Sequence, residues 1–206
     1  MSSAFGRNAC IDGPPCEAPY EGTHQMKKIC GPLLLFIFLT SFFVSAPAHA
    51  SDKGYRYWGY FQSTTGKGPW VSAMTGPTTV VSDGSVEGWV FTFSSDAIVD
   101  AQAPRLTPNF GKLCATTKFA GENKKRIGVV VDFGRAVLRP RGEVSPRSIA
   151  TCVVVDKSAI GFDVLQAVVK IRASSSGFVC ALSGYPAKEC GAEIPTPPSL
   201  LIRTKK

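Results

Sequence analysis

Aromatic side chains early in the chain are the residues best suited to bind a ligand by contact. All three tryptophans, Trp58, Trp70 and Trp89, lie between residues 55 and 93, with Tyr60 among them. Their rings could form a platform for a flat ligand, a sugar ring or a corrin, because aromatic rings offer large and selective contact surfaces. They could equally pack as core residues on strands. Tyr185 could join the platform or pack on a nearby crosslink.

Three carboxylates could perform acid and base chemistry. Glu87, Asp83 and Asp132 are candidates for glycoside hydrolysis, which needs two acids about 5–10 Å apart. Asp83 is also explained by the Asp-Gly turn in which it lies, and Asp132 by the end of a strand. Arginines that could hold a phosphate or carboxylate, or else remain as solvated surface charge, are Arg105, Arg126 and Arg147.

The position of the histidines excludes several mechanisms. His24 and His49 both lie within the first 50 residues. The chain beyond them therefore cannot build a Ser-His-Asp triad, a Cys-His pair or a histidine metal site. We predict no catalytic residue, no metal and no cofactor.

A leader segment accounts for those first residues. Met26-Lys27-Lys28 precedes an apolar run from Leu33 to Val44, and Ala48-His49-Ala50 follows. A charged start, a short apolar run and an A-x-A site are typical of a signal peptide, here 26–50. The run is shorter than the 20 or so residues that span a bilayer. Met26 could then serve as the start, in which case 1–25 is expected to be a disordered upstream extension.

The remaining cysteines predict disulfides. Four follow the leader, and an even number in an exported chain favours two bridges. Three pairings are possible. We favour Cys114–Cys152, which would tie a helix to a strand, and Cys180–Cys190, which closes a short local loop.

The charge of the chain favours anionic partners. The formal net charge is +8, and the basic and acidic residues of the first 50 positions cancel. The basic residues are scattered, and the one tight run, Lys124-Lys125-Arg126, is interpreted as a solvated start of a strand. In an exported protein we expect no nucleic acid, and attraction to anionic envelope polymers or lipid headgroups instead.

Alternation of apolar residues predicts the secondary structure. In the strand at 55–62, Trp58 and Tyr60 share a face, opposite Tyr55, Tyr57 and Phe61. Helices are expected after Thr107-Pro108 and over 162–171. The result is an α+β fold with a mostly antiparallel sheet, in one domain over 51–192. The Pro-rich basic tail, 193–206, is expected to be disordered. Further strands are predicted at 70–74, 86–93, 127–133, 149–155 and 178–182.

Four motifs carry a resemblance to a known family. They are Tyr55-Arg-Tyr-Trp58, Asp83-Gly-Ser-Val-Glu-Gly-Trp89, Lys124-Lys-Arg-Ile-Gly-Val-Val-Val-Asp-Phe-Gly134 and Gly184-Tyr-Pro-Ala-Lys-Glu-Cys190. With them the chain resembles a family of uncharacterised exported proteins of Gram-positive actinobacteria. The family's association with energy-coupling-factor, cobalt-type transporter genes implies a part in extracytoplasmic nutrient capture. Many members end in a Pro-rich linker and a membrane anchor; here Pro195–Pro198 starts such a linker, and no apolar span follows.

A fainter resemblance concerns Tyr57-Trp58, Trp70–Gly76 and the segment Asp83–Phe91. Their order is similar to the C-terminal β-rich domain of transcobalamin-like proteins, which implies a corrinoid ligand.

Together these observations predict a secreted or extracytoplasmic, envelope-associated protein that binds rather than catalyses. Its expected partners are a small molecule, corrinoid-like or glycan, and a membrane transporter. The alternatives are a cell-wall glycan enzyme with paired carboxylates and a structural envelope module. Tryptophan rings lining an open groove would favour binding, and full burial of all three would favour the structural module.

Overall fold

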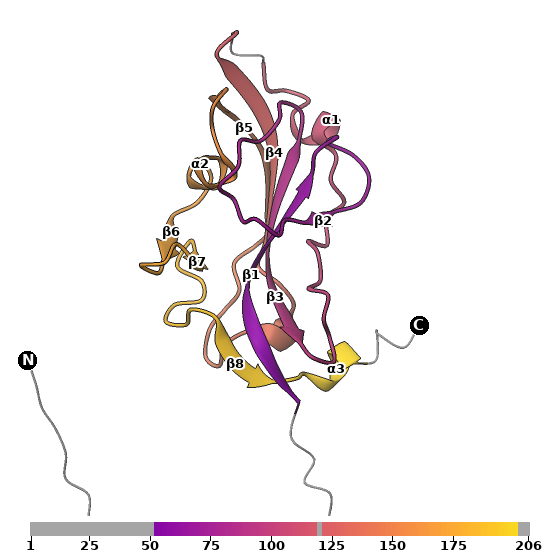
Figure 1. Ribbon diagram of the computed structural model, residues 1–206, viewed down its shortest axis with the longest axis vertical. Coiled ribbons are helices and arrows are strands. Elements are labelled where there is room, and N and C mark those ends of the chain that lie inside the picture. Colours follow the sequence, from indigo (N-terminus) through magenta and orange to yellow (C-terminus); the bar gives the residue numbers. More distant parts are fainter. Residues whose placement is uncertain (1–51, 119–120, 202–206) are drawn as a thin grey trace, which may run out of the picture. The chain divides into compact units, whose positions relative to one another are not determined.

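The computed structural model describes residues 52–118 and 121–201, and these residues confirm an α+β fold with a mostly antiparallel sheet (Figure 1). The main sheet has the strand order β2-β1-β3-β4-β5, and β8 pairs with β1 as well. Among the strands that the structure describes, β3 and β4 are the one parallel pair. The strands of this sheet are β1 Lys53–Ser63, β2 Val71–Ser72, β3 Val86–Ser95, β4 Lys124–Asp132, β5 Ile149–Asp156 and β8 Ala192–Pro195.

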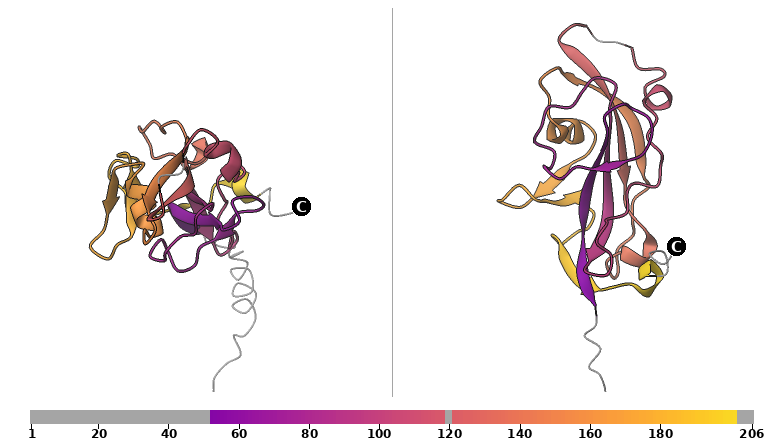
Figure 2. Two further views of the ribbon diagram at one scale, coloured as in Figure 1. Left: turned by 90° about the horizontal axis from the view of Figure 1, so that it is seen from above. Right: turned by 45° about the vertical axis from the view of Figure 1, so that its right-hand side comes forward.

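Smaller elements cover the sheet. A two-stranded sheet, β6 and β7, stands to one side of the large sheet (Figure 2). Three short helices and one 3-10 turn complete the described elements. Their bounds are β6 Ile171–Ala173, β7 Val179–Leu182, α1 Phe110–Leu113, α2 Gly161–Gln166, α3 Pro198–Leu201 and the 3-10 turn Ala136–Leu138.

The aromatic alternation of β1 and β3 builds the core. Trp58 lies opposite Phe91, and Tyr60 lies opposite Trp89, on one face of the antiparallel pair. All four belong to the main buried cluster, together with side chains from α2, β7 and the 183–191 loop. Phe61, on the opposite face of β1, is also buried but lies outside this cluster, so β1 is covered on both faces near that end.

Glycines let other segments close over the second face of the sheet. A Cβ on Gly88 of β3 would lie 2.7 Å from the Trp70 ring, and a Cβ on Gly128 of β4 would lie 3.0 Å from Leu113. A larger side chain at either position would push the covering segment away. The sheet is thus packed on both faces, and its outer edges are where backbone can remain accessible.

Both predicted disulfides are confirmed. Cys114, the residue that ends α1, is bonded to Cys152 on β5. Cys180 on β7 is bonded to Cys190 and closes the loop that leads to β8. The first bridge fixes the crossover between the parallel strands β3 and β4, and the second fixes the loop that carries Tyr185.

Two expectations about the elements are wrong. The helix expected over 162–171 ends at Gln166, and β6 begins at Ile171, because β-branched residues near that end favour an extended hairpin with β7. In the tail expected to be disordered from 193, the described residues 193–201 include most of β8 and the whole of α3, with Leu200 buried. Pro195 is accommodated because it lies at the end of an edge strand, opposite Lys53. The expected extension and signal peptide, 1–50, lie outside the described residues.

Candidate functional site

The outer edge of β1 is interrupted. At one end β8 pairs with Lys53–Arg56, and at the other end β2 pairs with Phe61 and Gln62. Within the described chain, no strand pairs with Tyr57–Gly59 on this side. We call this gap the edge notch.

A groove of about 600 Å³ lies at the edge notch. Five consecutive residues of β1 line it, and successive residues of a strand alternate between the two faces of the sheet, so the groove lies along the edge of the strand. Among the residues that the structure describes, no charged side chain lines it. The lining residues come from β1 (Tyr57–Phe61), the loop after β2 (Ser72, Ala73, Met74, Gly76, Pro77, Thr78), the β6–β7 turn (Ser176–Val179), and Trp89 and Ala101.

The backbone of Trp58 points into the edge notch. The Tyr60 carbonyl accepts a hydrogen bond from the Ala73 N–H (3.0 Å), so Tyr60 directs its backbone groups away from β3. Backbone direction alternates along a strand with period two, and the pairing of β1 with β3 has no register break. The N–H and C=O of Trp58 therefore face the same way as those of Tyr60, into the gap.

Three of the five aromatic candidates meet at the edge notch. Trp58, Tyr60 and Trp89 contribute to its lining although each is buried, with exposed fractions of 6%, 7% and 1%. Their ring faces already have partners inside the protein. Tyr60 stacks on Trp89 with centroids 4.9 Å apart, and Trp58 packs against Phe91 and Phe133.

The other two candidates lie elsewhere. Tyr185 is buried behind Trp58, whose indole Nε1 donates to the Tyr185 carbonyl (3.2 Å), and its hydroxyl accepts from Ser145. Burial raises the pKa of Tyr185 above its ordinary value. Trp70 is partly exposed on the second face of the sheet, where it donates to the Leu106 carbonyl (2.9 Å). The structure thus separates Trp70 from the aromatic group proposed from the sequence.

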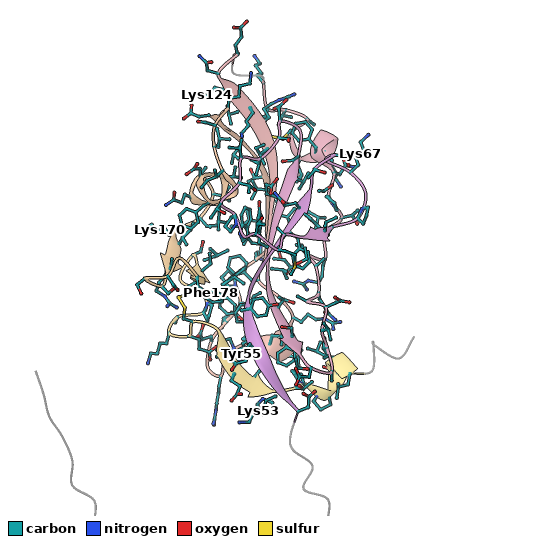
Figure 3. All side chains as sticks on the ribbon, viewed as in Figure 1. Lys53, Tyr55, Lys67, Lys124, Lys170 and Phe178 are labelled. Carbon is teal, nitrogen blue, oxygen red and sulfur yellow. A yellow bond between two sulfur atoms is a disulfide. The ribbon has the colours of Figure 1, made fainter. Side chains whose placement is uncertain are left out.

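Sequence reasoning missed the walls of the groove. Met74 is 92% exposed on the loop after β2, and Phe178 is 41% exposed beside β7. Figure 3 labels Phe178 on the side of the main sheet where β6 and β7 lie. The sequence placed both residues at the ends of predicted strands, 70–74 and 178–182, where an apolar side chain is expected to pack, so it held little signal that they line a groove.

A buried polar cluster lies behind the aromatic residues. Glu87 is fully buried and accepts hydrogen bonds from Ser85 (2.7 Å), Tyr60 (2.5 Å) and Gln62 (3.0 Å). Burial, and next the charge of Glu87, raise the pKa of Tyr60 far above its ordinary value, so the hydroxyl stays protonated and donates. The cluster holds the Tyr60 ring at one end of the edge notch.

The interpretation of Lys124-Lys125-Arg126 as a solvated start of a strand is wrong for Lys125. Lys125 is buried, and its Nζ donates to the carbonyls of Val81 (2.6 Å), Lys157 (2.9 Å) and Ala159 (2.9 Å). Burial lowers the pKa of Lys125, while the charge of Glu87 opposes that change. Lys125 therefore joins two loops from inside, rather than forming a solvated start of the strand.

The remaining carboxylates have structural partners of their own. Asp132 accepts from the Arg105 backbone N–H (2.9 Å), its Nε (2.9 Å) and its Nη2 (2.6 Å), and from the Gly134 N–H (3.0 Å). Asp83 accepts from the Arg126 N–H at 2.7 Å. Burial opposes ionisation of Asp132, but the hydrogen bonds from Arg105 and Gly134 bring its pKa below the ordinary value.

Arginine side chains are likewise held within the fold or exposed. Arg126 donates to the Thr117 carbonyl and lies over the Phe110 ring, whereas Arg147 is exposed. Among residues 52–118 and 121–201, no three His, Cys, Asp or Glu side chains lie close enough to hold a metal ion. No helix in that part of the chain is long and apolar enough to cross a bilayer.

Fold and site together define a disulfide-bonded α+β domain with an uncharged groove at an interrupted strand edge. The chain belongs to the SCO2322-like domain family, whose model matches residues 50–195. That family is uncharacterised and takes its name from a Streptomyces protein, in agreement with the actinobacterial resemblance. No curated protein and no solved structure matches the chain.

Proposed function

We propose that the protein is an exported, non-enzymatic binding or accessory protein of the cell envelope, which holds its ligand in the edge notch. The observation that carries this proposal is the uncharged groove of about 600 Å³ at the unpaired part of β1. Its size falls in the range of ligand-binding sites, and it combines apolar walls with a few hydroxyls.

Two further observations support export and contact. Two disulfides tie down a domain of modest size, as is typical of proteins in oxidising compartments. The three carboxylates considered for hydrolysis each have partners within the fold, and Glu87 is fully buried. Their placement favours binding over glycan hydrolysis. Capture of a nutrient or cofactor for a transporter remains the physiological role that we propose.

Thermal unfolding of the purified protein tests the proposal. The probes are cobalamin, cobalt, cell-wall glycan fragments and a library of uncharged hexapeptides. A ligand that binds the native state raises the melting temperature by mass action. Met74→Lys places a charge in the groove, and Val144→Lys places one at an exposed site (81%) outside its lining.

We expect at least one probe to raise the melting temperature of the parent protein and of Val144→Lys, but not that of Met74→Lys. If no probe acts through the groove, the proposal is wrong and a structural envelope module is the better description.

A further inference from the structure

We infer that the edge notch binds an extended, uncharged polypeptide segment, which pairs with β1 as an added strand. This inference rests on the proposed function and names the class of partner for the same site. Strand addition at an open sheet edge is a known mode of peptide recognition, in which backbone hydrogen bonds give affinity and alternate side chains give specificity.

The unpaired backbone is the first argument. Trp58 directs one N–H and one C=O into the gap, while its side chain is buried in the core. Backbone polar groups that are removed from water without a partner cost free energy comparable to a lost hydrogen bond. A segment lying along β1 would satisfy both groups at once.

The alignment of the neighbouring strands is the second argument. β2 runs antiparallel to β1 and leaves it after Ser72, with a last hydrogen bond from Ala73 to Tyr60. β8 also runs antiparallel and joins β1 at Ala192, opposite Arg56. An antiparallel segment opposite Tyr57–Gly59 would fill the row between them, so the sheet already defines its direction and register.

The lining chemistry is the third argument. A strand in the gap would direct alternate side chains toward the two faces of the sheet, one set toward Phe178 and the other toward Tyr57. The walls offer apolar surface and the hydroxyls of Ser72, Thr78 and Ser176, without a charged group. A charged side chain placed there would lose water without gaining a partner. The segment is therefore uncharged, with apolar and small polar residues.

Ring placement favours a strand over a flat small molecule. Stacking on a corrin or sugar would need a free ring face, but Tyr60 stacks on Trp89, and Trp58 packs against Phe91 and Phe133. The side of the aromatic group that meets the groove is the strand edge and its backbone.

Peptide binding with backbone methylation tests the inference. The probe is a library of acetylated and amidated hexapeptides built from Thr, Val, Leu, Tyr and Gln. The tightest member is then made in two further versions, one with N-methyl groups on its odd-numbered residues and one with N-methyl groups on its even-numbered residues. Because successive N–H groups of a strand point to opposite sides, one version lacks the N–H groups that face β1, and the other lacks those that face away from it. We expect the affinity to fall at least about tenfold for the version that lacks the N–H groups facing β1, and to stay unchanged for the other version.

Amide exchange and groove variants locate the contact. On peptide binding, exchange of the Trp58 backbone amide should slow at least about tenfold, because the amide gains a hydrogen-bond partner. Met74→Lys and Phe178→Lys should weaken binding by a similar factor, and Val144→Lys should leave it unchanged.

The outcomes separate this inference from the proposed function. If cobalamin or a glycan binds through the groove and no peptide does, the proposed function stands and the inference falls. Equal binding of the two methylated peptides, or no change at Trp58, also overturns it. If nothing binds through the groove, both are wrong.

Discussion

Tyr60 connects the groove to the interior through its hydroxyl. The hydroxyl donates to Glu87, which has no exposed surface, and Gln62 donates to both groups. Hydrogen bonds to a buried charged group are worth more than those between neutral groups, and a lost partner leaves part of the desolvation cost uncompensated. The ring position of Tyr60 thus depends on a residue that a ligand in the groove would not touch.

Tyr60→Phe removes that hydroxyl alone. We expect the free energy of unfolding to fall by about 1–3 kcal/mol, because Glu87 loses one of its donors. Urea denaturation measures the change. Tyr57→Phe is the matched control, since the Tyr57 hydroxyl accepts only a long bond from Ser94 (3.3 Å) and should change stability by less than about 0.5 kcal/mol. Equal losses in both variants would contradict the role given to Glu87.

Asp132 gives stability a pH dependence. Its pKa in the folded protein lies below the ordinary value of 3.8, so the unfolded state binds the proton more readily. The stabilisation by ionised Asp132 is therefore fully present above about pH 4 and is lost as the pH falls through the lower, folded pKa.

Asp132→Asn should remove this dependence. We expect the stability difference between parent and variant to be largest near neutral pH and to shrink as the pH falls below about 4. Denaturation at a series of pH values measures it. Asp100→Asn, at an exposed position, is the control. A difference that stays constant across the acid range would contradict the assignment.

At the scale of elements, a disulfide fixes a segment that is too short to be fixed by the packing of its own side chains. α1 contains no buried residue, yet its end is fixed to β5 through Cys114 and Cys152. Cys114→Ser should lower the free energy of unfolding by about 2–5 kcal/mol, as for native disulfides in small exported domains. Denaturation of parent and variant measures the loss. Non-reducing peptide mapping of the parent protein should recover a linked peptide that contains Cys114 and Cys152. Recovery of free thiols at both positions would contradict the bridge.

The C-terminal segment contributes to the core through one side chain. Leu200 of α3 is buried in the main cluster. Leu200→Ala should lower the free energy of unfolding by about 2–5 kcal/mol through lost burial and a cavity. Val99→Ala, at a 79% exposed position, is the control for loss of an apolar side chain without burial, and it should leave the free energy of unfolding nearly unchanged. A neutral Leu200→Ala would mean that the tail does not pack as described.

Most elements could be predicted from local pattern, because large aromatic residues alternate along β1 and β3, and β4 and β5 contain continuous runs of β-branched residues. The segment after Gln166 could not, since Val168, Val169 and Ile171 suit a helical stripe or a strand, and pairing with β7 decides between them. The edge notch could not be predicted either. It exists because β2 and β8 stop at particular points along β1, and those stops depend on tertiary packing.

For the whole molecule, the net charge of +8 predicts attraction to anionic surfaces. We expect the purified protein to cosediment with phosphatidylglycerol vesicles at low salt, and to be released as salt shortens the Debye length to about 8 Å and below. Neutral phosphatidylcholine vesicles are the control. Equal binding to both lipids, or no release by salt, would contradict an electrostatic attachment.

The pairing of the first strand with the last one has a mechanical consequence. Lys53 at the start of β1 lies opposite Pro195 at the end of β8, and the Thr196 N–H donates to the Asp52 carbonyl (2.7 Å). A force that pulled the chain apart at these two points would load the hydrogen bonds one after another rather than all together. β8 would peel from β1 at low force, starting at the Lys53–Pro195 pair and ending at the Arg56–Ala192 pair, so that the open edge at the notch would then extend along the whole start of β1.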